Sequence, residues 1–129
     1  MKKSDIDFSY FIGQLVTEVN TEVDLPLGMG FDQGGLIVEC PWRIRREKEI
    51  IIGASDCVHA PNKYSHKNVK QLLLEKKITD ISFYEEFSLL VIEFDESIFL
   101  DLFHESNYFE GWQLNGYEGF DLISLPGGF

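Results

Sequence analysis

The chain has 129 residues, of which 44% are hydrophobic and 26% charged, and its formal net charge is −11. That length fits a single domain, residues 1–129, which can bury a core without disulfide or metal staples. No apolar run approaches the roughly 18 to 20 residues that span a bilayer, and the N-terminus turns acidic where a signal peptide needs an apolar stretch. We therefore expect a cytoplasmic protein with no membrane association.

The first half of the chain predicts a short helix followed by strands. The large apolar residues of segment 4–12 share one face, which indicates an N-terminal helix. Next, "LVTEVNTE" (15–22) alternates apolar and polar residues, as a strand with one solvated face does. Asp32-Gln33-Gly34-Gly35 is typical of a turn, because glycine adopts positive φ freely. "KEIIIGA" (48–54) predicts a further strand.

A central helix and a second group of strands are predicted after the break at Ala60-Pro61-Asn62. Ser65 is a candidate N-cap, and the apolar positions of "SHKNVKQLLLEKK" (65–77) form one face of an amphipathic helix. "FSLLVIEF" (87–94) is nearly all apolar, which suits a strand buried on both faces. "EGFDLISL" (118–125) predicts the last strand.

Segments 14–53 and 77–125 resemble each other, which indicates a duplicated unit. Phe31-Asp32 matches Phe94-Asp95 at an offset of 63 residues, and Trp42 matches Trp112 at an offset of 70. Each unit predicts an antiparallel β-meander. The predicted fold class is α+β and mostly β, with the meanders forming a sandwich or a partly open barrel beside the N-terminal and central helices. The tryptophans are predicted as core anchors or pseudo-twofold mates, with an exposed binding role as the alternative.

The residues that could carry catalysis form no recognised constellation. Cys40 and Cys57 have no CxxC spacing, and His59, His66 and His104 lie in three different predicted elements. These spacings favour neither zinc ligation nor a disulfide. Cys57 and His59 also lie too close in sequence to face each other as a nucleophile and its base. We expect no enzymatic activity, no metal and no cofactor.

Three arginines, Arg43, Arg45 and Arg46, follow Trp42 in an otherwise acidic protein. Strand alternation places Trp42 and Ile44 on one face and Arg43 and Arg45 on the other. On one interpretation, the arginines form the outer face and rim of a hairpin and pair with the acidic second unit. On the other, they hold a small anionic ligand between the two units, in a pocket beside Trp42, as part of a binding module or an enzyme.

Negative charge is concentrated in the second part of the chain. Residues 1–77 hold all 11 Lys and Arg and 11 of the 22 Asp and Glu, while residues 78–129 hold the other 11 acids and no Lys or Arg. This acidity argues against a nucleic-acid partner, because phosphate binding needs positive charge along the contact. It favours a basic protein partner, although a bias towards solubility would give the same pattern.

The stretch "ECPWRI" (39–44), with "IIIGASD" downstream and "GWQLNGYEGFDLISLPGG" near the end, resembles a family of small uncharacterised bacterial proteins. In size, acidity and lack of a catalytic motif, that family is similar to the immunity proteins of polymorphic-toxin and contact-dependent inhibition systems. The resemblance implies an inhibitor that binds a cognate toxin domain and occludes its active surface.

Acidic and aromatic side chains of the second unit are the candidate contact residues for such a toxin. The stretch from Phe103 to Gly111, an insertion relative to the first unit, ranks first among them because loops on a rigid scaffold often carry function. A homodimer formed through an edge strand is a further interpretation. The candidate contact residues are Glu85, Glu86, Asp95, Glu96, Glu105, Tyr108, Phe109, Glu110, Tyr117 and Glu118.

Overall fold

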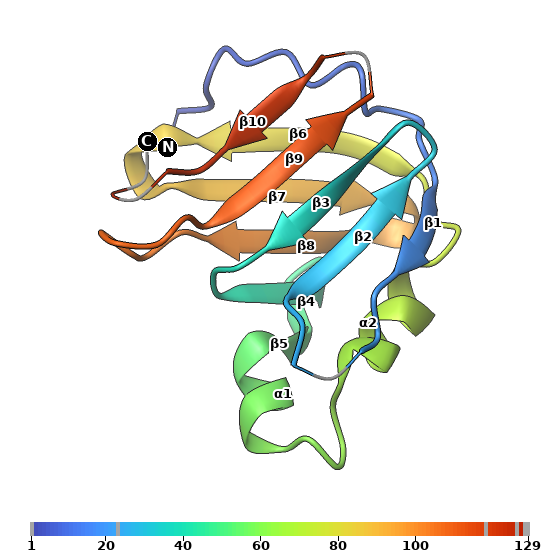
Figure 1. The fold of residues 1–129 in the computed structure, drawn as a ribbon. Coiled ribbons are helices and arrows are strands. Elements are labelled where there is room, and N and C mark those ends of the chain that lie inside the picture. Colours follow the sequence, from blue (N-terminus) through green and yellow to red (C-terminus); the bar gives the residue numbers. More distant parts are fainter. Residues whose placement is uncertain (1, 23, 118, 126, 128–129) are drawn as a thin grey trace.

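Two five-stranded antiparallel sheets face each other in the computed structural model, which describes residues 2–22, 24–117, 119–125 and 127 (Figure 1). The strands are β1 (Val16–Val19), β2 (Leu27–Phe31), β3 (Gly34–Val38), β4 (Trp42–Arg46), β5 (Glu49–Gly53), β6 (Ile78–Tyr84), β7 (Leu89–Phe94), β8 (Ile98–Phe103), β9 (Trp112–Gly116) and β10 (Asp121–Ile123). The first sheet has the order β1-β2-β3-β9-β10 and the second β5-β4-β8-β7-β6. The sheets do not close into a barrel, so the mostly β, α+β class is confirmed in its sandwich form.

The predicted central helix is confirmed. Helical segments in the described part of the chain are α1 (Ala54–His59), α2 (His66–Leu73) and the 3₁₀ turns η1 (Glu85–Phe87) and η2 (Asp95–Ser97). Ser65 caps α2: its hydroxyl accepts from Lys67 N at 3.3 Å, and its N–H donates to Asn68 Oδ1 at 2.8 Å. The apolar face of α2 packs on β1 through the fully buried Val69 and Leu73. None of the described helices has the length and apolar character needed to cross a membrane.

The predicted N-terminal helix over residues 4–12 is wrong. Residues 2–8 have no regular secondary structure and residues 9–13 form turns. Ser4 N donates to Phe83 O at 2.7 Å, so the segment runs beside the edge strand β6. Phe11 is nevertheless fully buried. The edge strand provides a hydrogen-bond acceptor for the backbone, and the core buries the apolar side chains. A short isolated helix has neither, so these tertiary contacts override the helical pattern.

Each predicted unit contains an antiparallel meander of three strands, and its last two strands lie in the other sheet. The first unit forms the β1-β2-β3 meander of the first sheet and then the β4-β5 hairpin of the second. The second unit follows the same order with the sheets exchanged: β6-β7-β8 and then β9-β10. The junctions also correspond, since β3 pairs with β9 and β8 pairs with β4, both antiparallel. This arrangement has the pseudo-twofold symmetry that a duplication predicts.

A backbone seam between residues 13–16 and 75–78 joins the two units. Leu15 and Lys77 form an antiparallel bridge at its centre. On either side, the N–H groups of Gly13 and Glu75 donate across the seam, each over 2.8 Å. These two residues are equivalent, and both have positive φ, 92° at Gly13 and 66° at Glu75. The symmetry therefore extends to single backbone groups.

Two aspartates fasten this seam in equivalent ways. Asp32 Oδ2 accepts from Leu15 N, and Asp95 Oδ2 accepts from Lys77 N, each at 2.8 Å. Both aspartates belong to the Phe-Asp pairs on which the predicted duplication depends. The sequence match thus corresponds to a matching structural role.

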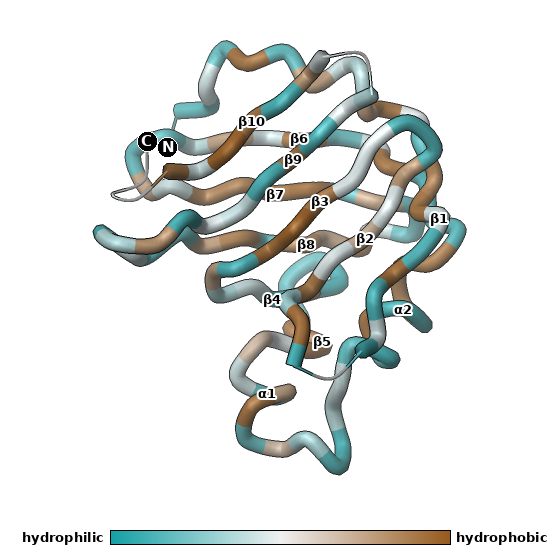
Figure 2. The backbone as a smooth tube through the Cα atoms, viewed as in Figure 1, coloured by the Kyte–Doolittle hydropathy of each residue, from teal (hydrophilic) through white to brown (hydrophobic). Residues whose placement is uncertain are grey.

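Trp42 and Trp112 are equivalent residues of the core. Trp42 lies opposite Leu102, and Trp112 lies opposite Val38. Both indoles are buried, which confirms the core-anchor interpretation over the exposed one. Figure 2 shows hydrophobic residues along β7 and β8. One buried hydrophobic cluster contains residues of both units. On β7, buried residues alternate with half-buried ones, so its outer face is only partly covered.

Candidate functional site

Most of the candidate contact residues gather at one end of the sandwich. Because η1 precedes β7 and β8 runs back antiparallel to it, η1 lies at the same end as the loop that leaves β8 (Figure 1). The N–H of His104, just after β8, donates to Ser88 O, just after η1, at 3.2 Å. We call η1, loop 104–111 and Leu125 the β8–β9 end. It holds Glu85, Glu86, Glu105, Tyr108, Phe109 and Glu110.

Three other candidates lie elsewhere. Asp95 and Glu96 follow β7 at its far end, where Asp95 belongs to the seam and Glu96 Oε2 pairs with Lys76 Nζ at 2.6 Å. Tyr117 follows the far end of β9, and its N–H donates to Gln33 O at 3.3 Å. Glu118 lies outside the described residues. The structure therefore separates Asp95, Glu96 and Tyr117 from the β8–β9 end.

Loop 104–111 is fastened by its own side chains. Ser106 Oγ accepts from Tyr108 N at 3.0 Å and from Phe109 N at 2.8 Å, which closes a tight local turn. From outside the loop, Gly127 N donates to Ser106 O at 2.9 Å. The rings of Tyr108 and Phe109 meet edge to face, with centroids 4.9 Å apart. The loop thus presents two aromatic rings in a defined arrangement, which lowers the entropic cost of binding a partner.

His104 holds this loop from below. Its ring is buried, with Nδ1 hydrogen-bonded to Ser124 Oγ and Nε2 donating to Phe109 O at 2.8 Å. Gly111 lies against the same ring, so a Cβ at this position would come within 2.5 Å of His104 Cγ. Backbone bonds from Gly111 N to Ser124 O and from Glu39 N to Gly111 O, at 2.9 and 2.8 Å, anchor the end of the loop. The glycine is needed here for close packing.

The β8–β9 end combines exposed apolar side chains with negative charge. Tyr108 is 80% exposed, Phe109 66% and Phe87 60%, and Leu125 is also exposed. The four carboxylates of this end, Glu85, Glu86, Glu105 and Glu110, are exposed around them. On the η1 side, Lys2 and Lys3 share a shallow hollow with Glu85 and Glu86 and reduce the negative potential there. The loop itself contains no Lys or Arg, so no cation of the loop offsets the charge of Glu105 and Glu110 beside the aromatic pair.

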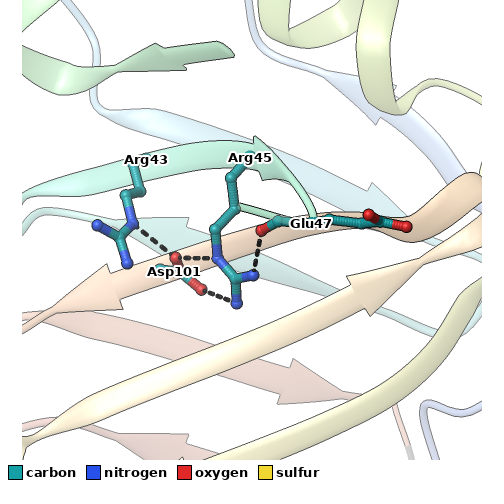
Figure 3. Close-up of polar contacts among 4 residues, drawn as sticks. All are labelled: Arg43, Arg45, Glu47 and Asp101. Atoms are coloured by element: carbon teal, nitrogen blue, oxygen red, sulfur yellow. Dashed lines mark hydrogen bonds and ion pairs between the residues drawn. The ribbon is translucent and has the colours of Figure 1, made fainter. Parts of the chain in front are cut away.

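Arg43 and Arg45 lie on the outer face of the second sheet and bind Asp101 of β8 (Figure 3). Arg43 Nε and Arg45 Nε each donate to Asp101 Oδ2 at 2.7 Å, and Arg45 Nη2 donates to Oδ1 at 3.2 Å. Their guanidinium groups also lie over Phe103 and Phe99. Asp101 is only 1% exposed, so two cations compensate one buried anion. Arg43 and Arg45 thus pair with the acidic second unit, and the exposed Arg46 takes no part in this triad.

The pocket predicted beside Trp42 does not contain the arginines. Trp42 faces the core, whereas Arg43 and Arg45 lie on the opposite face of the same strand. A hollow of about 390 Å³ does adjoin Trp42, and it is lined by Leu25, Cys57 and His66 among others. An anionic ligand of the arginines would therefore have to lie on the outer face of the sheet.

Cys57 and His66 share that hollow without forming an activated pair. Burial raises the pKa of Cys57 and lowers the pKa of His66, and both shifts favour the neutral forms. A nucleophilic cysteine needs the opposite shift, towards thiolate. Burial also raises the pKa of Cys40 to about 12. Among the described residues, no group of three or more His, Cys, Asp or Glu side chains could hold a metal ion.

Four residues with positioning roles were not among the sequence candidates: Asp101, His104, Gly111 and Ser124. The pairing of Asp101 could have been predicted, because a carboxylate inside the apolar strand "IFLDLF" needs a cationic partner. The contacts of His104, Gly111 and Ser124 could not, since they join the start of a loop to the end of the chain. Sequence periodicity does not report such contacts.

No protein-family model, curated protein or solved structure matches this chain. The surfaces of the molecule itself are therefore the basis for inferring its function.

Proposed function

We propose that this protein is a cytoplasmic immunity protein, without enzymatic activity, that neutralises a cognate bacterial toxin by binding it through the β8–β9 end. One observation supports this most: an exposed aromatic pair lies on a fastened loop and is surrounded by carboxylates. Rigid aromatic anchors with a charged rim are typical of protein-binding surfaces. The partner is a basic toxin domain, because opposite charge steers association.

Inhibition then works by occlusion. Toxin domains that act on nucleic acid need a basic surface to hold phosphates. Glu105 and Glu110 would approach that surface, while Tyr108 and Phe109 would fill apolar gaps within it. The rim charges would act mainly on the association rate, and the aromatic anchors on the dissociation rate.

The proposal predicts that a neighbouring reading frame encodes a toxin, and the C-terminal domain of that toxin is the partner for the test. Co-expression is expected to restore the growth that the toxin alone abolishes. Tyr108→Ala is expected to weaken binding by at least 2 kcal/mol, an effect on the order of those at interface hot spots. The double change Glu105→Lys and Glu110→Lys is expected to slow association and to reduce its dependence on salt. Surface plasmon resonance at several salt concentrations measures both effects.

Tyr117→Ala is the matched control, because Tyr117 is a similarly exposed aromatic residue at the opposite end of the molecule. It is expected to leave affinity and growth rescue unchanged. Equal losses at Tyr108 and Tyr117, or no loss at either, would contradict the proposed surface. Absence of growth rescue by the wild-type chain would contradict the immunity function.

A further inference from the structure

A second surface, unrelated to the β8–β9 end, lies on the outer face of the second sheet. It is a hollow of about 370 Å³ over β4, β8, β7 and β6. The strand registers place Arg43, Asp101, Val91 and Ser82 in one row across these strands. Leu89 and Val91 form an apolar floor within it, and the polar members of the row lie on either side of that floor.

Arg43 has hydrogen-bonding capacity left in this hollow. In the described part of the chain, its guanidinium donates only from Nε, to Asp101, and Figure 3 shows its two terminal nitrogens beyond that contact. The Arg43 side chain is 40% exposed, so both terminal groups can be reached from solvent. Arg45 has less hydrogen-bonding capacity left, because it donates to both carboxylate oxygens of Asp101 and to Glu47 O.

Ser82 is a second polar group directed to the hollow. Ser82 lines the hollow, and as a residue it is 9% exposed. Among the described residues, Ser82 Oγ is not one of the buried side-chain polar atoms that lack a partner, so it can hydrogen-bond to solvent or to a ligand in the hollow. It lies two strands away from Asp101 along the same row, across the apolar floor from Arg43.

Charge balance limits the ligand. Arg43 and Arg45 together with Asp101 leave one net positive charge at this edge of the hollow. Asp80 and Glu93 line the hollow as well, next to each other in the strand register, and Lys3 adds one further cation. One carboxylate balances the single positive charge that the arginines and Asp101 leave, whereas a doubly charged phosphate would add excess negative charge beside Asp80 and Glu93.

We infer that this hollow binds a small organic monocarboxylate with an apolar body. The carboxylate accepts hydrogen bonds from the terminal nitrogens of Arg43, in the bidentate geometry that guanidinium favours. The apolar body lies on Val91 and Leu89, and a polar substituent on it reaches the hydroxyl of Ser82. This site does not depend on the proposed immunity function, because it shares no residue with the β8–β9 end.

Benzoate is the probe, and benzamide is its neutral control of nearly the same shape. Titration of the wild-type chain, followed by amide NMR shifts at low salt, is expected to show saturable binding of benzoate at β4, β7 and β8. Benzamide is expected to bind at least tenfold more weakly. Arg43→Gln is expected to weaken benzoate binding at least tenfold, and Arg43→Lys by less, since it keeps the charge but loses the bidentate fork.

Arg46→Gln is the matched control, because Arg46 has the same charge on the same strand but does not line the hollow. It is expected to leave the dissociation constant of benzoate unchanged. Thermal melting of each variant checks folding, and Arg43→Gln is expected to fold because Arg45 still binds both oxygens of Asp101. Equal binding of benzoate and benzamide, equal losses at Arg43 and Arg46, or no saturable shift in the wild type would each overturn the inference.

Discussion

At the scale of single residues, the triad of Arg43, Arg45 and Asp101 distinguishes the second sheet from the first. In the other sheet, the register pairs Ile37 with Gln113, at the positions equivalent to Asp101 and Arg43. Asn115 is likewise equivalent to Arg45, since it lies two residues along the same strand. All three charges are thus absent together from the first sheet. This pattern is expected when each charge is tolerated only because the others compensate it.

Removal of the buried carboxylate is expected to be costly. Asp101→Asn leaves two arginines facing a neutral side chain and should lower the free energy of unfolding by about 3 kcal/mol. Urea denaturation measures the change. The matched variant Arg43→Gln with Arg45→Asn and Asp101→Ile copies the uncharged set of the other sheet and should lose less. A larger loss in the triple variant than in Asp101→Asn would show that the ion pairs themselves stabilise the sheet.

At the scale of elements, loop 104–111 is the clearest difference between the units. It accounts for most of the change in offset between the Phe-Asp pairs and the tryptophans. Its conformation depends on Ser106 within the loop and on His104 beneath it. Because the ring of His104 fills the space beside Gly111, this loop has little room to rearrange.

Gly111→Ala is expected to displace His104 and loosen this loop. Overpacking of a close contact costs on the order of 1–3 kcal/mol, and the new Cβ would lie 2.5 Å from His104 Cγ. Chemical denaturation measures the loss, and faster amide exchange at Phe109 reports the loosened loop. Gly28→Ala is the control, because a Cβ there meets its nearest atom at 3.7 Å. Similar losses at both glycines would argue against a specific role for His104.

At the scale of the whole molecule, the two units interlock around the seam at residues 13–16 and 75–78. Each sheet contains strands from both units, so neither unit can complete a sheet alone. The hydrogen bonds of Gly13 and Glu75 across the seam need a left-handed backbone at both positions. Glycine adopts that conformation without strain, whereas glutamate does not.

Substitutions at these two positions should have opposite effects. Gly13→Ala is expected to destabilise the protein by about 1 kcal/mol, because alanine is strained at positive φ. Glu75→Gly relieves the strain of positive φ, but glycine also loses more backbone entropy on folding. The net change in stability should therefore be zero or a gain of less than about 1 kcal/mol. Thermal unfolding of both variants, measured by circular dichroism, provides the comparison. A loss at Glu75→Gly as large as that at Gly13→Ala would contradict the equivalence of the two positions.

The sequence by itself determined the local features of this protein. Strand alternation, a turn at Asp32-Gln33, the cap of α2 and the duplicated Phe-Asp and tryptophan positions were all predicted, because each depends on neighbouring residues or on a repeated pattern. The positive φ expected at Gly34 and Gly35 was wrong, since both belong to β3 and neither has positive φ. Strand alternation also placed Arg43 and Trp42 on opposite faces. At residues 4–12 the apolar spacing fits a helix, but the backbone has no helix and lies beside a sheet.

Only the tertiary structure decided which surfaces exist. It exchanged the hairpins of the two units between the sheets, brought Asp101 to arginines 58 and 56 residues away, and separated Asp95, Glu96 and Tyr117 from the β8–β9 end. It also placed Ser124 under a loop that begins 20 residues earlier in the chain. Such pairings depend on which strands meet across the whole chain. Periodicity reports the face on which a residue lies, but not its neighbour on that face.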